Sequence, residues 1–177
     1  MGQYYKPVNI DKKEFVYSHD YENGLKLMEH SWIENDFVAI VENLIKKGGA
    51  WYKNRIVWAG DYAENEPNTN ENLYDLVGEE PIKPKSKRDK KLRYLKNLDT
   101  KEFVNLSKVP VSEVYNDFKF RIHPLPLLTC EGNGQGGGDY FGQDKNNLIG
   151  KWARNRVTIQ SHKPKDGIEL VFDLIEK

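Results

Sequence analysis

Residues 131–142, EGNGQGGGDYFG, are the most constraining stretch of the chain, because six of its 14 glycines fall there. Glycine loses more backbone entropy on folding than any other residue, and in return it reaches positive φ and allows close approach to the backbone. Flexible linkers are usually rich in Gly and Ser and lack large side chains. This stretch has no serine and contains Asp139, Tyr140 and Phe141. We therefore predict a shaped loop, which we call the glycine loop.

The glycine loop contains a Gly-x-Gly-x-x-Gly pattern that starts at Gly132. As a dinucleotide-binding pattern it needs a strand before it and a helix after it. Residues 120–130 carry two prolines, and Gly138 and Gly142 fall where the helix should begin, so we exclude a Rossmann site. Consecutive glycine N–H groups can still form an anion-binding concavity without a helix. The alternative is a structural bend around a bulky neighbour.

Composition favours one globular domain spanning residues 1–177. Aromatic residues make up 12% of the chain, which argues against disorder. Lys+Arg and Asp+Glu both number 27, so the net charge gives no attraction to nucleic acid or to a membrane. The single cysteine, Cys130, excludes an intrachain disulfide and suits the cytoplasm. We expect a cytoplasmic protein with no membrane or nucleic-acid partner, and no oligomeric state follows from the sequence.

One helix is strongly indicated, over residues 36–47. Asn35 is a suitable N-cap, and Gly48 can adopt the left-handed conformation that ends a helix. Apolar residues recur on one face of this helix. They are Phe37, Ile40, Val41, Leu44 and Ile45.

Extended segments make up most of the remaining pattern, which predicts an α+β fold with a mainly antiparallel sheet. The expected strands are residues 4–10, 14–17, 51–59, 92–95, 102–106, 118–128, 156–160 and 168–174. We expect hairpins between the first two, between 92–95 and 102–106, and between the last two.

Residues 64–91 differ in character from the rest. Their first part is acidic, their second part is basic, and prolines 67, 81 and 84 interrupt them. Blocks of opposite charge are usually solvated. We therefore predict an exposed excursion, and a basic patch for nucleic acid is the less favoured interpretation.

The sequence also contains an internal repeat. Residues 9–16 (NIDKKEFV) match residues 97–104 (NLDTKEFV) at six of eight positions. Residues 49–56 and 150–157 share the pattern Gly-x-Trp-x-x-Asn-Arg-Ile/Val. Both matches occur in the same order, which favours two related halves, 1–63 and 92–177, with a pocket at their junction. The alternative is that Asp-Lys-Lys-Glu is common hairpin-turn chemistry.

Clusters of polar and aromatic residues are the candidates for function. An Asp beside an aromatic ring can accept a hydrogen bond from a base or ribose while the ring stacks. Alternatively, each Asp caps a turn and each Tyr packs. Arg154 and Arg156 alternate on an expected strand, so both would face one side and could bind an anion. The predicted ligand site is His19, Asp20, Tyr21, His30, Trp58, Asp61, Tyr62, Asn133, Gly136, Gly137, Gly138, Asp139, Tyr140, Arg154 and Arg156.

Four sequence motifs resemble those of an uncharacterised family of small bacterial and phage proteins. They are MGQYYK, HDYxNGxKLxEHSW, VWAGDYA and EGNGxGGGDY. The resemblance covers most of the chain outside residues 64–91 and brings no activity with it. It implies a mobile-element setting, in which small proteins often act on host defence or host enzymes.

Three functions stay open at this point, and the leading one calls for no cofactor and no metal. The first is a non-enzymatic protein that binds a small anionic, nucleotide-like ligand and could sequester a host defence signal. The second is a metal-dependent hydrolase or transferase that uses His19, Asp20, Asp61 and Asp139. The third is a protein–protein inhibitor of a host protein. Cys130 could also act as a nucleophile with His123, although a buried, inert cysteine is commoner.

Overall fold

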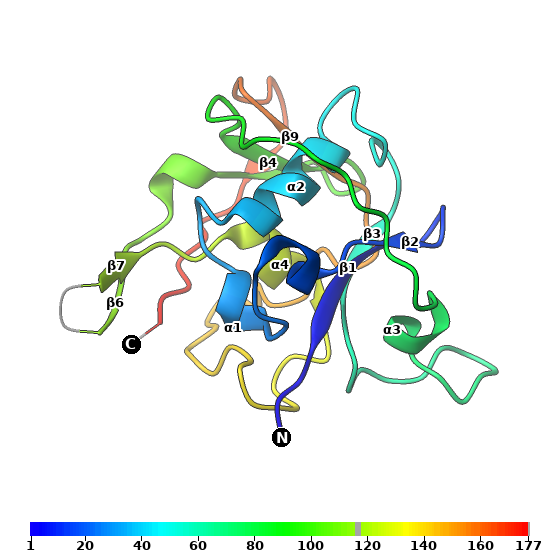
Figure 1. Ribbon diagram of the computed structural model, residues 1–177. Coiled ribbons are helices and arrows are strands. Elements are labelled where there is room, and N and C mark those ends of the chain that lie inside the picture. Colours follow the sequence, from blue (N-terminus) through cyan, green and yellow to red (C-terminus); the bar gives the residue numbers. More distant parts are fainter. Residues whose placement is uncertain (116–117, 177) are drawn as a thin grey trace.

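The computed structural model describes residues 1–115 and 118–176, and it shows the α+β fold that the sequence predicts. Its longest helix is α2 (Asp36–Ile45), and most strand pairs are antiparallel (Figure 1). The shorter helices are α1 (Leu27–His30), α3 (Leu73–Leu76), α4 (Pro124–Thr129) and the 3₁₀ helices η1 (Ser18–Tyr21) and η2 (Leu106–Lys108). No helix in the two described ranges is long and apolar enough to cross a membrane.

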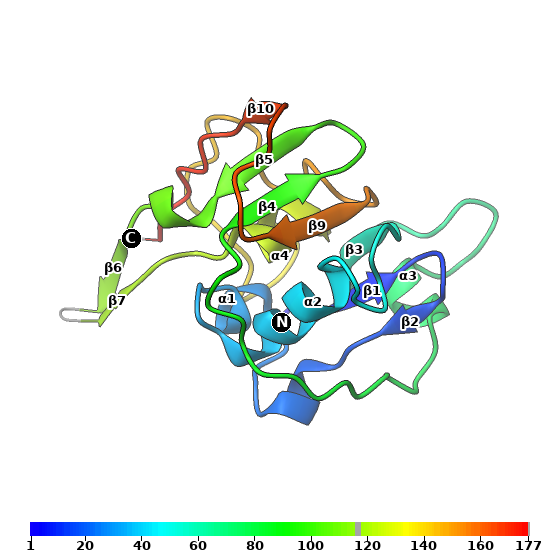
Figure 2. The same ribbon diagram turned by 90° about the horizontal axis from the view of Figure 1, so that it is seen from above.

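Two four-stranded sheets form the scaffold. The first has the order β2-β1-β3-β8 and the second β10-β5-β4-β9. Their strands are β1 (Tyr5–Asn9), β2 (Glu14–Phe15), β3 (Ile56–Gly60), β8 (Cys130–Glu131), β4 (Tyr94–Asn97), β5 (Glu102–Asn105), β9 (Val157–Gln160) and β10 (Ile168–Glu169). A separate hairpin, β6 (Ser112–Tyr115) with β7 (Phe118–Phe120), projects from the body (Figure 2).

The two longer helices each pack against a strand from the other half of the chain. Helix α2 packs against β9 of the second sheet, whereas α4 packs against β3 of the first. A hydrogen bond from the Thr158 hydroxyl to the Ile45 carbonyl, 2.8 Å long, ties α2 to β9. Trp51, Trp58 and Trp152 are fully buried in the core around these helices. Each helix therefore fills the space next to the strands of the other half of the chain.

The prediction of α2 is confirmed. Asn35 caps it, since its side-chain oxygen accepts a hydrogen bond from the Val38 N–H. The helix ends at Ile45, two residues earlier than expected, and Gly48 follows with a φ of 88°.

The extended segment expected over residues 118–128 is wrong beyond Phe120, because α4 begins at Pro124. Both of its prolines lie in the first turn of the helix, where the backbone N–H groups need no partner. The His123 side chain caps this turn, since its Nδ1 accepts from the Leu125 N–H at 3.0 Å. Pro124 and Pro126 therefore mark the start of a helix and not an extended segment.

Two strand predictions also need correction. Residues 51–53 form a turn with Lys53 at a φ of 66°, and β3 begins only at Ile56. The last expected hairpin does not form, because β10 pairs in parallel with β5. Strand β9 pairs with β4 instead, with Leu95 opposite Ile159. After β9 the chain therefore crosses to the opposite edge of the sheet, where β10 lies beside β5.

The repeated sequence makes the same contacts twice. Asn9 donates from its amide to the Asn54 side-chain oxygen at 3.0 Å, and Asn97 donates to Asn155 at 3.0 Å. All four occupy matching positions of the two sequence repeats. We call residues 9–56 and 97–157, which contain these contacts, the first and second repeats.

The two tryptophan turns are held in the same way. The indole N–H of Trp51 donates to Glu14 and that of Trp152 donates to Glu102, both at 3.1 Å. Trp51 and Trp152 thus occupy equivalent positions, each in a turn five residues before its strand rather than at the head of it.

The arginines of the repeats mark the relation between them. Arg55 and Arg156 face each other across an antiparallel bridge. Each pairs with the aspartate of its own hairpin turn, Asp11 or Asp99. Equivalent residues that face one another lie next to the axis that relates them. An approximate twofold axis therefore passes between Arg55 and Arg156.

The excursion over residues 64–91 is largely exposed, and it is fixed to the body. It contains α3 and then runs across the molecule near α2 before it enters β4 (Figure 1). The Tyr21 hydroxyl donates to the Pro84 carbonyl at 2.6 Å, and the Asn43 amide donates to the Lys87 carbonyl at 2.8 Å.

The repeat predicts matched effects of mutation on stability. Asn9→Ala and Asn97→Ala should each lower the free energy of unfolding by about 1–3 kcal/mol, because each leaves buried polar partners unpaired. Chemical denaturation measures both values, and Asn70→Ala, at an exposed position, is the control. A large loss in one variant with none in the other would contradict the equivalence of the repeats.

Candidate functional site

The glycine loop does form an N–H concavity, and the side chain of Asp139 fills it. One carboxylate oxygen of Asp139 accepts from the backbone N–H groups of Gly134, Gln135 and Gly136 at 2.7, 2.9 and 3.1 Å. Asp139 is 3% exposed. The expectation that these N–H groups meet an external anion therefore needs correction, because the anion that they bind belongs to the loop itself.

Two residues of the N-terminal segment complete this site. The Gln3 amide donates to the same Asp139 oxygen at 2.7 Å and to the Gly132 carbonyl at 2.7 Å. The Tyr5 hydroxyl donates to the other Asp139 oxygen at 2.9 Å. Burial raises the pKa of Tyr5, and the nearby charge of Asp139 raises it further, so the phenol keeps its proton. The glycine loop is thus bonded to the N-terminal strand.

Glycine is required in this loop for two physical reasons. A Cβ atom on Gly136 would lie 2.7 Å from the Gln3 backbone nitrogen, which is too close for any side chain. Gly134 has a φ of 94°, in the left-handed region that L side chains avoid. The dense glycines therefore let the loop wrap around a carboxylate and against a strand.

A hollow of about 600 Å³ lies beside the glycine loop. It brings together three residues of the predicted ligand site: Tyr62, Asn133 and Arg154. Tyr62 is 39% exposed, so one part of its ring is open to a ligand. The full lining is Tyr62, Ala63, Glu64, Asn65, Glu66, Pro67, Glu131, Gly132, Asn133, Gln135 and Arg154. We call this site the loop hollow.

Arg154 lies in a turn before β9, so the expectation that it alternates with Arg156 on a strand is wrong. Its φ is 68°, and its backbone N–H donates to the Ile56 carbonyl at 2.8 Å. The guanidinium lies between two glutamates. It donates to Glu131 from Nε at 2.5 Å and from Nη2 at 3.0 Å, and to Glu66 from Nη1 at 3.1 Å and from Nη2. These hydrogen bonds raise the pKa of Arg154.

Arg156 lies at the approximate twofold axis and does not line the loop hollow. Its Nε donates to Asp99 at 2.7 Å, and its backbone N–H donates to the same carboxylate at 2.8 Å. Arg154 lines the loop hollow and Arg156 does not. The two arginines therefore do not share the surface that the prediction required.

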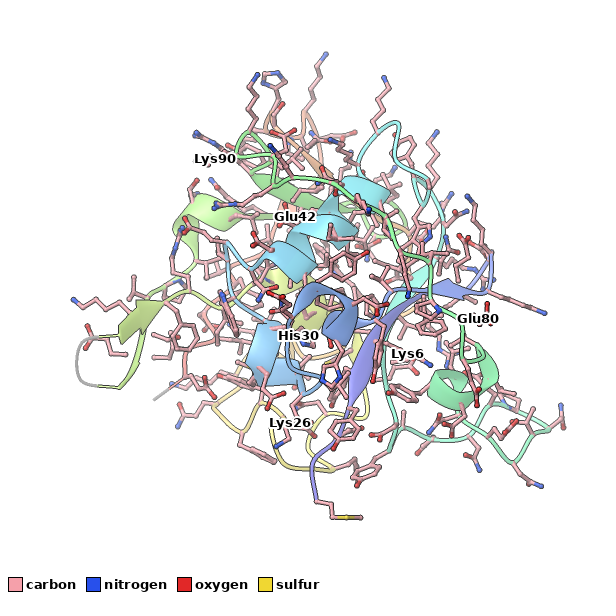
Figure 3. All side chains as sticks on the ribbon, in the orientation of Figure 1. Lys6, Lys26, His30, Glu42, Glu80 and Lys90 are labelled. Atoms are coloured by element: carbon pink, nitrogen blue, oxygen red, sulfur yellow. The ribbon has the colours of Figure 1, made fainter. Side chains whose placement is uncertain are left out.

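His30 and Trp58 belong to the core, which corrects their placement in the predicted ligand site. Both are fully buried, and the Trp58 indole N–H donates to His30 Nε2 at 2.9 Å. His30 Nδ1 lies 2.9 Å from the Gly24 carbonyl and donates to it. Figure 3 shows His30 in the interior of the molecule. Burial lowers the pKa of His30 to about 4, so the ring is neutral.

The cluster at residues 19–21 lies in η1. Asp20 pairs with Lys83 at 3.9 Å, and both His19 and Asp20 are exposed. Asp20 and Tyr21 line a different hollow, of about 430 Å³, together with residues of α2 and residues 86–88. This cluster does not share a hollow with the glycine loop.

The other predicted residues have structural partners. Asp61 accepts from the Tyr4 backbone N–H at 2.9 Å, and burial raises its pKa. Tyr140 is 3% exposed, with its hydroxyl 3.0 Å from the Ile175 carbonyl. The Gly137 N–H donates to the Met1 carbonyl, and the Gly138 carbonyl accepts from Met28. The expected single concavity is therefore divided among the loop hollow, other hollows and the core.

The residues of the enzymatic alternatives lie in different surroundings. Among the residues described, no three His, Cys, Asp or Glu side chains are grouped so as to hold a metal ion. Burial raises the pKa of Cys130 to about 12, which keeps it a thiol. His123 bonds to Glu42 at 2.7 Å, so its ring is committed to α2.

Sequence reasoning missed four residues that build the site: Gln3, Tyr5, Glu66 and Glu131. Glu66 and Arg154 are 88 positions apart, and Gln3 and Asp139 are 136 apart. No local pattern pairs residues at such separations. The one available signal was that Glu131 directly precedes the glycine loop.

Comparison with known proteins adds no name to this site. No family model, curated protein or solved structure matches the chain.

The burial of His30 predicts a pH dependence of stability. Its pKa in the folded protein, about 4, lies below its ordinary value of 6.5, so protonation favours unfolding. The stabilisation is complete above pH 6.5 and is lost as the pH falls toward 4, by roughly 1.4 kcal/mol per pH unit. His30→Gln lacks this titration. The stability gap between wild type and His30→Gln should therefore narrow from pH 7 to pH ~4.5 in urea titrations, and a constant gap would contradict a neutral buried histidine.

Proposed function

We propose that this protein is a non-catalytic binding protein for a small anionic, nucleotide-like ligand, and that the loop hollow is its binding site. The observation that carries the proposal is that the oriented guanidinium of Arg154 and the partly exposed side chain of Tyr62 line the same hollow. A cytoplasmic location and a role in sequestering a host signal belong to the same proposal.

The geometry of Arg154 favours an anionic group in the ligand. Glu131 bonds to the Nε side of the guanidinium and so fixes the plane of the group. The end of the guanidinium, with Nη1 and Nη2, faces Glu66 across the hollow. Two parallel N–H donors in one plane match the oxygens of a carboxylate or phosphate. Glu131 and Glu66 together outweigh the charge of Arg154, so an anionic group has to take the place of Glu66 to use these two donors.

The ring of Tyr62 favours a planar group in the ligand. It is 39% exposed at the rim of the hollow. An aromatic side chain of this kind stacks on a base without selecting its sequence, and such stacking contributes about 1–3 kcal/mol per base. The backbone of Gly132 and the side chains of Asn65 and Gln135 offer polar contacts around the ring. A nucleotide-like ligand would satisfy both Tyr62 and Arg154.

We keep a protein partner as a second candidate, because other large apolar side chains are exposed. Phe141 in the glycine loop is 70% exposed, and Tyr4 in the N-terminal segment is 41% exposed. Exposed aromatic residues are typical anchors of protein interfaces.

A binding panel tests the proposal. Nucleoside monophosphates and cyclic nucleotides should raise the melting temperature, whereas the corresponding nucleosides should raise it less. Tyr62→Ala should weaken binding by about 1–3 kcal/mol through the loss of stacking. Arg154→Lys keeps the charge but loses the paired donors, so it should reduce the preference for nucleotides over nucleosides.

Tyr4→Ala is the matched control, because it removes an exposed tyrosine outside the loop hollow. Equal losses from Tyr4→Ala and Tyr62→Ala would contradict the site. No stabilisation by any compound of the panel would contradict the ligand class and favour the protein partner.

A further inference from the structure

Residues 64–71 form a loop whose first four residues line the loop hollow, and hydrogen bonds within the loop hold its tip together. The Glu66 N–H donates to the Glu71 carbonyl at 2.8 Å, and the Thr69 N–H donates to the Glu66 carbonyl at 3.1 Å. The Thr69 hydroxyl adds a contact of 2.8 Å with the Glu71 carbonyl. These bonds hold the tip in one shape. We call it the lid loop.

The lid loop is joined to the body at its base and through Glu66. At the base, the Asn72 amide donates to the Asp61 carbonyl at 2.8 Å. Across the hollow, Glu66 pairs with Arg154, the one ion pair that the lid loop makes within residues 1–115 and 118–176. The Glu66 side chain is only 16% exposed, so the pair closes over this part of the hollow.

We propose that Glu66 is an internal competitor of the ligand, which occupies the anion-binding end of Arg154 and latches the lid loop over the hollow. This inference rests on the proposed function, because it describes how the access of a ligand to that same site is regulated. The chemical class that it implies is a carboxylate or phosphate group, because its oxygens can replace those of the glutamate on both donors.

The two partners of this pair are held differently. Arg154 is fixed by Glu131 on one side and by the bond from its backbone N–H to Ile56. Glu66 is carried by a loop with its own internal bonds, which is anchored at its base by Asn72. Opening would therefore carry Glu66 away and leave the Arg154–Glu131 pair in place. The Nη1 and Nη2 groups of Arg154 would then be free to donate to a ligand.

The latch has a consequence for affinity. A ligand can use Arg154 only in the fraction of molecules that are open, so its apparent affinity is reduced by that fraction. If about one molecule in ten is open, removing the competing carboxylate should strengthen the apparent affinity by roughly tenfold. Glu66→Gln makes this change with almost no change in shape.

Spin-label distances test the latch without any ligand. Cys130 is buried, so cysteines introduced at the exposed positions Asn70 and Gln135 can be labelled selectively. One label lies on the lid loop and the other on the glycine loop, where Gln135 lines the hollow. In the doubly labelled protein, Glu66→Gln should shift the pulsed-EPR distance distribution to longer and broader distances. Glu64→Gln, an exposed residue of the same loop that loses the same charge, should leave it unchanged.

Two outcomes overturn the inference. The latch is absent if Glu66→Gln leaves the distances as in the parent protein. It is also rejected if Glu64→Gln shifts them equally, because the effect would then follow net charge rather than the bond to Arg154. Because the measurement contains no ligand, the latch can hold even when the nucleotide panel fails, and the panel can succeed with a lid loop that stays closed.

Discussion

The carboxylate of Asp139 is the interaction on which the candidate site depends. It accepts hydrogen bonds from three backbone N–H groups of the glycine loop and from Gln3 and Tyr5 of the N-terminal segment. A buried carboxylate is costly to desolvate, and a full set of donors offsets that cost. Because the loop follows α4 and the segment leads into β1, one side chain ties the two halves of the chain together. It also sets the position of Gly132, which forms part of the wall beside Tyr62.

The repeats provide the scaffold, and the segments outside their shared pattern provide the site. In the first repeat, residues 46–50 join α2 directly to the turn of Trp51. At the equivalent place in the second repeat, the chain inserts β8 and the glycine loop between α4 and Trp152. The lid loop belongs to the connection between the repeats. The loop hollow thus forms where an insertion in one repeat meets the connecting segment, while the shared contacts hold the rest of the fold.

Local chemistry explains which features the sequence could predict. The α+β class, the cap of α2 by Asn35 and the hairpin turns with Asp11 and Asp99 depend on residues that are close in sequence. The failures depend on distant partners. Nothing near His30 indicates that Trp58 will bury it, and nothing near Asp139 indicates that Gln3 and Tyr5 will bind it. The prolines of α4 misled for another reason, since a proline in the first turn of a helix and a proline in an extended segment look alike.

Chemical denaturation of Asp139→Ala tests the central claim most directly, with Asp166→Ala as the control that removes the same charge from an exposed position. The account predicts that Asp139→Ala lowers the free energy of unfolding by at least about 1–3 kcal/mol, the cost of leaving one buried donor unpaired. Asp166→Ala should change it by less than about 0.5 kcal/mol. A stable Asp139→Ala protein that has lost only ligand binding would contradict the account, because the carboxylate would then serve a ligand rather than the loop.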